Sequence, residues 1–358
     1  MKKLDKYIIG KFLGTFFYSL ILIIVIVVVF DISEKIDDFI SKEAPLKAIV
    51  FDYYFNFIPY FANLFSALFT FIAVIFFTSK LAGDTEIIAI LSSGVSYKRF
   101  LVPYLISASI LTILSFFLIN WIIPPANGKR LEFEEKYIRN RYRYNDKNIH
   151  KQILPGTFEF MESYNNIYDI GYKFSIEKFE NGKLKSKLLS DYVQWDTTIN
   201  KWKITNYVNR EIVEGKEIVT SGRRIDTSIN LFPDDFERRT NLVEAMNYNE
   251  LNKFIDNEIM IGSDNVTLWK IEKHKRFAFP FSTLILTIIG VSLSSRKRRG
   301  GIGINIGLGI FLAFSYIMFM QIATVMATNA NISPILAVWI PNILYSLIAL
   351  WLFFRASK

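Results

Sequence analysis

Few residues in this chain have the type and spacing that catalysis or metal binding requires. The sequence holds two histidines, His150 and His274, and no cysteine, which excludes disulfides and thiolate metal sites. It has no G-x-x-x-x-G-K-[ST] phosphate loop, no G-x-S-x-G nucleophile motif and no H-E-x-x-H zinc motif. Both histidines lie in charged segments, where a solvated basic edge explains them better than catalysis. We therefore expect no enzymatic activity, cofactor or metal.

The glycine-rich stretch "GGIGINIGLG", residues 300–309, superficially resembles a dinucleotide-binding loop. It follows "RKRR" and opens a long apolar run, whereas a dinucleotide loop joins a strand to a soluble helix. Gly303 and Gly307 have the G-x-x-x-G spacing that lets helices pack closely in lipid. We interpret the stretch as a helix-packing or gating surface.

The elements that carry these residues are mostly apolar. The chain has 358 residues, is 51% hydrophobic and has a mean hydropathy of +0.27, which indicates an integral membrane protein. Uncharged stretches cover residues 12–30, 53–79, 100–128, 277–295 and 300–354. Because a span needs roughly 20 apolar residues, the first four stretches give one span each. The last gives two, separated by a turn at "TNANISP", so six transmembrane helices are predicted.

The distribution of lysine and arginine predicts the orientation. Basic residues gather at both chain ends, between spans two and three, and in "RKRR" between spans four and five. By the positive-inside rule, the N- and C-termini are cytoplasmic and the long insert after span three lies on the far side. The net charge of +9 arises from these cytoplasmic caps, because the insert is nearly neutral. We therefore expect no nucleic-acid partner.

Polar side chains are sparse inside the predicted spans, and no ionisable group lies in the middle of one. This argues against a carrier driven by protons or ions. The chain thus has neither a visible catalytic centre nor a visible energy source. If it moves a substrate, another protein supplies the power.

A short helix is predicted at about residues 84–94, "DTEIIAILSSG", between spans two and three. Asp84 or Thr85 can cap its start, Glu86 lies in the first turn, and Gly94 supplies the stop. Its apolar stripe and its carboxylate favour contact with a partner. A helix lying on the lipid surface is the alternative. The residues assigned to this contact are Asp84, Glu86, Ile87, Ile90, Leu91 and Gly94.

The insert predicts an all-β domain. Residues 168–176 alternate with a period of two, and the Asn-Gly pair that follows is a strong hairpin signal. Further hairpins are predicted where Trp195 and Trp202 flank a polar turn, and at Glu214-Gly215. This spacing favours an antiparallel sandwich or β-jellyroll. The edges and clefts of such a domain can bind lipid chains or a partner's strand. The alternative is a sheet whose aromatic side chains fill its own core. The expected division is 1–128 (spans one to three), 129–260 (β-domain) and 261–358 (spans four to six).

In their order along the chain, these parts resemble the LptF/LptG (YjgP/YjgQ) permease family. The resemblance rests on "LDKYIIGKFLGTF", "DTEIIAILSSG", "NWIIPPAN", "W-x-I-x-N" and "LFPDDF", and "LDKYI" is closer to the LptG branch. It implies a six-span subunit of the lipopolysaccharide export ABC transporter, located in the bacterial inner membrane, with a periplasmic jellyroll. Its implied partners are an LptB-type ATPase dimer, a second LptF/LptG-type permease and LptC/LptA-type periplasmic proteins.

The resemblance also implies residue roles. The short helix inserts into a groove on the ATPase, with Glu86 at the family's acidic position. The family often carries lysines at the outer end of span one that meet lipid phosphates, and Lys35 and Lys42 are the candidates here. Acidic residues surround both, so a solvated loop charge is an equal alternative. A second basic group, Arg139, Arg141 and Arg143, is either a lipid contact or a juxtamembrane stalk.

Two other functions remain alternatives at this point: a non-transporting membrane scaffold, and a membrane enzyme that modifies lipids or glycans. The enzyme needs a carboxylate, histidine or arginine constellation at the membrane face, and the sequence supplies none that we can assemble.

Overall fold

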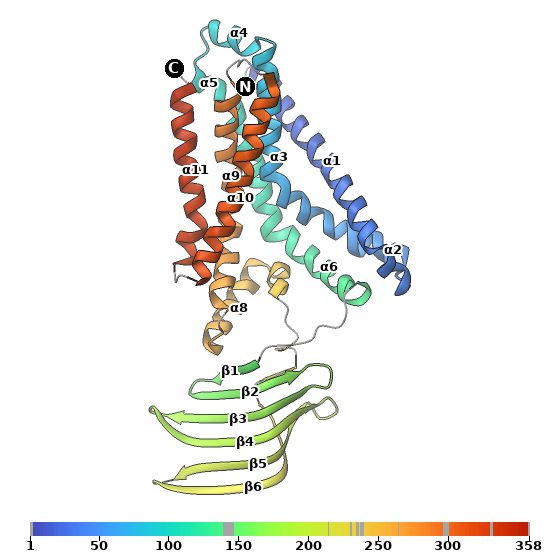
Figure 1. Cartoon of the computed structure of the whole chain (residues 1–358), viewed down its shortest axis with the longest axis vertical. Helices are drawn as coiled ribbons and strands as arrows, with labels where there is room; N and C mark the ends of the chain where they lie inside the picture. The colour runs from blue at the N-terminus through green and yellow to red at the C-terminus, as the bar shows by residue number, and fades with distance from the viewer. Residues whose placement is uncertain are drawn as a thin grey trace. The chain divides into compact units, whose positions relative to one another are not determined.

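The computed structural model describes residues 3–138, 147–213, 215–229, 231–233, 236, 240–263, 265–295, 301–329 and 332–356. Within these ranges six helical segments are long and apolar enough to cross a membrane (Figure 1). A six-stranded sheet is inserted between the third and the fourth. The prediction of six transmembrane helices with an inserted β-domain is therefore confirmed. The main helices are α1 (Lys3–Ser41), α3 (Phe55–Gly83), α5 (Tyr97–Phe117), α9 (Val266–Ser294), α10 (Gly301–Asn329) and α11 (Pro334–Ala356).

Two of these segments continue through wide π-helical turns. The short helix α2 (Leu46–Ala48) leads through the π-helix η1 (Ile49–Tyr54) into α3. Likewise α5 passes through the π-helix η2 (Leu118–Ile122) into α6 (Ile123–Tyr137), which has Pro at its first turn. The third helix thus extends beyond its apolar stretch. Because π-turns are rare and concentrate at functional sites, the end of the bundle near α2 and α6 is a candidate functional region.

Helix α3 is the centre of the bundle and packs against α1, α6 and α10. Where α9 meets α3, a side chain at Gly290 would place its Cβ 2.8 Å from a Val74 methyl group, so glycine permits the close approach. On α10, Gly309 fills the same role beside Ile75. By contrast, a Cβ at Gly303 or Gly307 would meet none of the described atoms within 4 Å. Both glycines are exposed on the surface of the isolated chain.

The connection between α3 and α5 holds the short helix α4 (Glu86–Ser92). Thr85 precedes it with a left-handed backbone (φ 60°) and makes no capping hydrogen bond, so the predicted side-chain cap is wrong. The predicted stop is confirmed, because Gly94 has φ +88°. In Figure 1, α4 and both labelled chain ends lie at the same end of the bundle, which we call the α4 end. The opposite end, where α2 and α6 lie, is the α6 end.

The six strands form one antiparallel sheet whose order follows the sequence, and each consecutive pair is a hairpin. The strands on either side of all three predicted turns pair as hairpins. Asn181 and Gly182 both have positive φ, and Trp195 pairs with Trp202, while Glu214 lies outside the described residues. Among the described residues the strands make a single sheet, so a two-sheet sandwich is not what they form. The strands are β1 (Lys147–Leu154), β2 (Thr157–Asn165), β3 (Ile170–Glu180), β4 (Lys183–Asp196), β5 (Lys201–Val213) and β6 (Lys216–Thr227).

One face of the sheet carries an apolar core around Trp202, whose indole N–H donates to the Leu231 carbonyl at 2.8 Å. The predicted alternation along β3 is wrong in one respect. Tyr172 is exposed while Phe174 is fully buried, although both were expected on one face. Lys173 between them has φ 51°, and this left-handed residue breaks the alternation of the strand.

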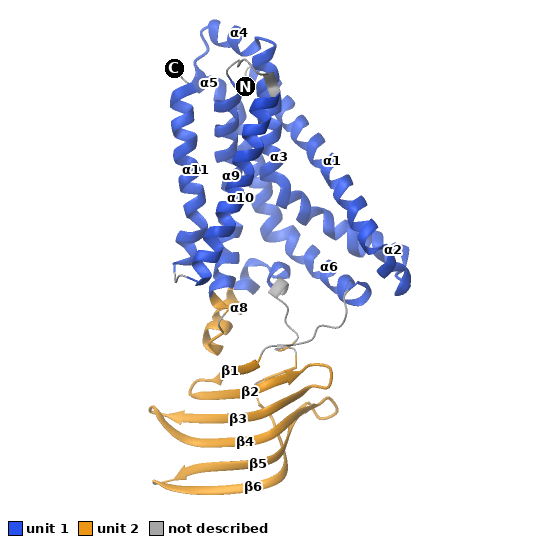
Figure 2. Ribbon diagram, viewed as in Figure 1, with its two compact units in different colours: residues 1–138, 243–251, 267–358 blue, residues 139–242, 252–266 orange. Residues whose placement is uncertain are grey.

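The chain divides into two compact units (Figure 2). Unit 1 comprises residues 1–138, 243–251 and 267–358, and unit 2 comprises residues 139–242 and 252–266. After the sheet, the chain passes through a 3-10 helix, η3 (Thr240–Ala245), into α8 (Tyr248–Ile261). Leu251 and Ile255, one helical turn apart on α8, are both buried.

Candidate functional site

The short helix α4 uses much of its apolar stripe to hold itself to the bundle. Ile87 is only 2% exposed and belongs to the core formed by α1, α3 and α5, and Ile90 and Leu91 pack against that core. Ile88 is 55% exposed and points away from it. The side chains that α4 offers to a partner are therefore Ile88 and the acidic residues Asp84 and Glu86, rather than the whole stripe.

Glu86 is half-buried and lies beside the first helix. Its carboxylate accepts a long hydrogen bond, 3.4 Å, from the Tyr7 hydroxyl. A second and shorter contact also involves α1: the Arg99 guanidinium on α5 donates to the buried Asp5 carboxylate at 2.7 Å. Helix α1 is thereby tied to the start of α5, just beyond α4. Sequence analysis did not find the Asp5–Arg99 pair, because its members are 94 residues apart.

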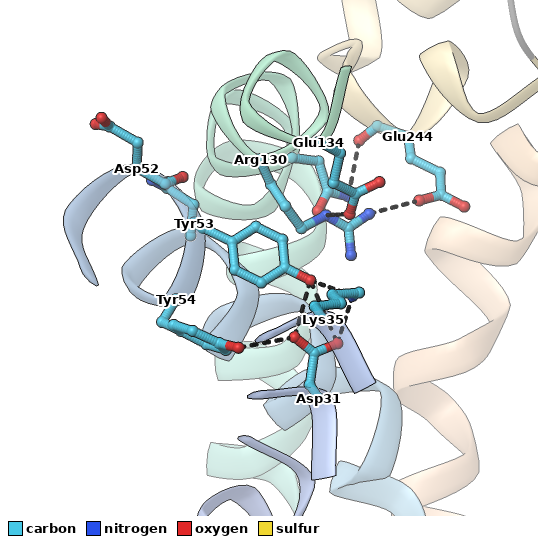
Figure 3. A network of polar contacts seen from close by, with 10 residues as sticks. Asp31, Lys35, Asp52, Tyr53, Tyr54, Arg130, Glu134 and Glu244 are labelled. Carbon is cyan, nitrogen blue, oxygen red and sulfur yellow. Dashed lines mark hydrogen bonds and ion pairs between the residues drawn. The ribbon is translucent and has the colours of Figure 1, made fainter. Parts of the chain in front are cut away.

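At the α6 end, Lys35 lies inside a polar cluster rather than alone (Figure 3). Its ammonium pairs with Asp31 one helical turn earlier, at 2.5 Å, and also donates to the Tyr53 hydroxyl. Tyr53 and Tyr54, from the π-turn η1, each donate to Asp31 at 3.0 Å. The expected lipid contact at Lys35 is thus bonded within the chain, and this cluster fixes the end of α1 against η1.

The other basic candidates have different positions. Lys42 follows the last residue of α1 and is half-buried. Arg139, Arg141 and Arg143 lie outside the residues that the structure describes.

Two buried arginines that the sequence analysis did not select form a second cluster at the α6 end. Arg130 on α6 lies between Glu134 (3.6 Å) and Glu244 (3.5 Å), with its guanidinium 4.8 Å from the centre of the Tyr60 ring (Figure 3). Arg276 on α9 is 3% exposed. It donates to the carbonyls of Val243 and Met246 at 2.8 and 2.7 Å. Since a buried charge needs such partners, these bonds hold both arginines in place.

Both arginines hold the stretch through which the chain returns from the sheet. We call residues 243–246 the return segment. Besides the arginine contacts, the Asn127 amide donates to the Glu244 carbonyl at 3.3 Å. Burial raises the pKa of the Glu244 carboxyl, as does the nearby Glu272 carboxylate, while Arg130 opposes the shift.

Next to the return segment lies a cavity of about 630 Å³ in unit 1, which we call the bundle pocket. Its walls come from α3, α6, α9 and α10 and are largely apolar, with Leu64, Phe279 and Phe314 among them. Its rim carries charges of both signs. The charged lining residues are Glu244, Glu272, Lys275 and Arg276. Apolar walls with a charged rim suit an amphiphile that has hydrocarbon chains and an ionic headgroup.

A second cavity of about 600 Å³ lies in the concave part of the sheet. Phe158, Phe160 and Leu189 supply apolar surface. The charged lining residues are of both signs: Lys173, Lys187, Glu159, Glu177 and Asp191. The outermost strand β6 exposes Ile218 and Val219, and among the described strands it has a neighbour on one side only. Such an edge is suited to pairing with a strand of another chain.

The described residues include no group of three or more histidine, cysteine, aspartate or glutamate side chains that could hold a metal ion. The polar features described for unit 1 are thus a sparsely bonded patch at the α4 end and two clusters at the α6 end. The second of these clusters, around the buried arginines, borders the bundle pocket. Two comparisons with known proteins complete this description. The family model for the lipopolysaccharide export system permease LptF/LptG matches residues 6–355. No curated protein sequence matches the chain.

Proposed function

Because the chain belongs to the LptF/LptG family of lipopolysaccharide export system permeases, we propose that it extracts lipopolysaccharide from the bacterial inner membrane. In this proposal an ATPase on a separate chain powers the step, and the lipid is passed to a periplasmic bridge. The match over residues 6–355 is the observation that carries it. A permease has no need of catalytic groups, in keeping with a chain that is not itself an enzyme.

The bundle pocket supports the proposal through its chemistry. Lipopolysaccharide combines several acyl chains with anionic phosphates on a sugar headgroup. Apolar walls from α3, α9 and α10 suit the chains, and Lys275 and Arg276 at the rim suit the phosphates. We propose the pocket as one wall of the path that the lipid follows. Lys35, Lys42, Arg139, Arg141 and Arg143 are proposed as further phosphate contacts, and Lys35 must first release Asp31.

The α4 end supports an external motor. We propose that an LptB-type ATPase dimer binds there and contacts Glu86, Asp84 and the exposed Ile88. This assignment makes both termini cytoplasmic and the sheet periplasmic. Both labelled termini lie at the α4 end, as the proposal requires (Figure 1).

Two other surfaces suit the remaining partners. The exposed Gly303 and Gly307 on α10 fit close packing against a second LptF/LptG-type permease. The free edge of β6 fits pairing with an LptC/LptA-type periplasmic protein. In this arrangement residues 1–128 and 261–358 form the membrane part, and residues 129–260 form the periplasmic domain.

The test is co-purification of the intact complex, mass spectrometry of its subunits and bound lipid, and reconstitution into lipid vesicles. We expect an ATPase subunit, bound lipopolysaccharide, and release of lipopolysaccharide to a soluble acceptor that needs both ATP and this chain. An ATPase partner without ATP-dependent release indicates the scaffold function instead. Absence of any ATPase partner contradicts the transporter assignment.

A further inference from the structure

The return segment is held on unit 1 by a set of contacts that differ from ordinary core packing. Arg276 binds two of its carbonyls, Asn127 binds a third, and Arg130 faces the Glu244 carboxylate. Val243 is buried, but these contacts are polar, and those of Asn127 and Arg130 are long, between 3.3 and 3.5 Å. Polar contacts of this kind are exchanged readily for contacts with another polar ligand.

Two of the residues that hold the return segment, Asn127 and Arg276, also line the bundle pocket, and so does Glu244 of the segment itself. A ligand in the pocket therefore lies within reach of the groups that fix the segment. The guanidinium of Arg276 prefers a phosphate to a neutral carbonyl, because a phosphate carries the opposite charge and accepts two parallel hydrogen bonds.

Asn127 adds an independent sign that the pocket takes a polar ligand group. Its side chain is fully buried, and its Oδ1 atom has no hydrogen-bond partner among the described residues. Because its amide nitrogen donates to a carbonyl, the orientation of the group is fixed, and Oδ1 is left to accept. A buried acceptor without a donor is costly, and a hydroxyl or amide N–H of an amphiphile would satisfy it.

We propose that the return segment is a clasp over the bundle pocket, and that Arg276 is the residue that positions it. An amphiphile with an anionic headgroup opens the clasp by taking over the contacts of Arg276. The chain that leads back from the sheet is then released from α6 and α9. This inference rests on the proposed function for the identity of the amphiphile, lipopolysaccharide, and not for the existence of the clasp.

The geometry offers a direct test. A Cβ at Gly128 on α6 would lie 3.8 Å from the Cβ of Ala245 in the return segment, which is the mean separation in disulfides. The chain has no cysteine, so a Gly128→Cys/Ala245→Cys pair is the only thiol pair present. Oxidation of that pair locks the clasp shut, and a reductant releases it.

The first readout needs no transport. In the purified full-length chain with Ala245→Cys alone, we measure the rate of maleimide labelling with lipopolysaccharide or with zwitterionic phosphatidylcholine. We expect lipopolysaccharide to raise the rate at least threefold and phosphatidylcholine to leave it unchanged. In an Ala245→Cys/Arg276→Lys background we expect fast labelling with either lipid, because an ammonium cannot span both carbonyls. Equal labelling rates with both lipids in the Ala245→Cys single variant, which retains Arg276, overturn the clasp.

The second readout is transport by the reconstituted complex. We expect oxidation of Gly128→Cys/Ala245→Cys to lower ATP-dependent release of lipopolysaccharide at least tenfold, and a reductant to restore it. A Ser186→Cys/Glu211→Cys pair, which joins partners on β4 and β5, is the control and should have no effect. If the fully oxidised Gly128→Cys/Ala245→Cys variant releases lipopolysaccharide at the undiminished rate, the return segment is a fixed tether, and the proposal is overturned. If the wild-type complex releases nothing, the proposed function fails, while the labelling readout still decides the clasp.

Discussion

The α4 end and the α6 end of the helical bundle use their polar residues in opposite ways. At the α6 end, Arg130 and Arg276 are buried and bonded to carboxylates and carbonyls of the same chain. At the α4 end, Glu86 accepts one long bond at 3.4 Å, and Ile88 and Asp84 are exposed. The charged groups of Arg130 and Arg276 are paired within the chain, whereas the acidic groups beside α4 are left largely available.

The difference separates what a residue does for the fold from what it does for a partner. A charge that the chain itself satisfies contributes to stability, and its loss leaves buried groups without partners. A charge that the chain leaves available contributes little to stability, so its value lies in binding. The two ends should therefore respond differently to the same kind of substitution.

The largest expected effect on stability is at Arg276. In Arg276→Met the carbonyls of Val243 and Met246 lose their buried donors, at a cost of about 1–3 kcal/mol each. We expect the thermal midpoint of the detergent-solubilised chain to fall sharply, as followed by tryptophan fluorescence. Lys253→Met, which removes an exposed cation on α8, is the control and should change little. Equal midpoints for the two variants would contradict the account of the α6 end.

Glu86 provides the opposite case. Glu86→Ala and Glu86→Arg should leave the thermal midpoint within the range of surface substitutions, roughly 0.5 kcal/mol. Under the proposed function, both should weaken assembly with the ATPase about tenfold or more, and the arginine variant more than the alanine variant. Exposed Glu132 on α6 gives the matched control, Glu132→Ala. Normal complex yield, hydrolysis and release in both Glu86 variants would show that α4 is not the coupling helix.

The glycines of α9 and α10 extend the same contrast to apolar surfaces. A Cβ at Gly290 would lie 2.8 Å from Val74 and 3.1 Å from Phe71, both buried, so Gly290→Ala should cost about 1–3 kcal/mol. Gly303→Ala meets none of the described atoms within 4 Å and should be neutral or slightly stabilising, because alanine favours the helix. Thermal unfolding of the isolated chain measures both. A Gly303→Ala defect that appears only on assembly with a second permease would sharpen the contrast.

The parts that sequence analysis predicted correctly are those fixed by local chemistry. Apolar run length determines the six helices, and the Asn181-Gly182 pair determines its hairpin. The exposed side of β3 was predicted incorrectly, because the left-handed backbone at Lys173 has no sequence signature. The contact of Asn127 with Glu244 joins residues 117 positions apart. Such contacts are set by how the helices pack, which composition and periodicity do not reveal.

A smaller effect is expected from the one strong ion pair at the α4 end. Asp5→Arg and Arg99→Asp each break the contact between α1 and α5 and should lower the thermal midpoint modestly, because the arginine is partly exposed. The double variant restores the pair with reversed charges and should recover most of the loss. If the loss of stability in the double variant equals the sum of the losses in the two single variants, the two charges do not interact, and the account of this ion pair is wrong.

The smallest effect is expected in the turn between β4 and β5, where polar contacts lie at the surface. Hydrogen bonds from Lys203 and then from Thr198 hold the pKa of the Asp196 carboxyl well below its usual range. A lowered native pKa means that the stabilisation is present at neutral pH, above the unfolded-state value of about 4. It is lost as the pH falls through the lower native value.

Asp196→Asn retains an acceptor for Thr198 and removes only the charge, so it should lower the midpoint slightly at pH 7. The difference from the wild type should shrink as the pH falls below about 4. A difference that stays constant or grows on acidification would show that the carboxylate charge is not its source. A large loss at neutral pH would show that a partly exposed ion pair can matter as much as the buried contacts of Arg276. That result would remove the basis for contrasting the two ends of the bundle.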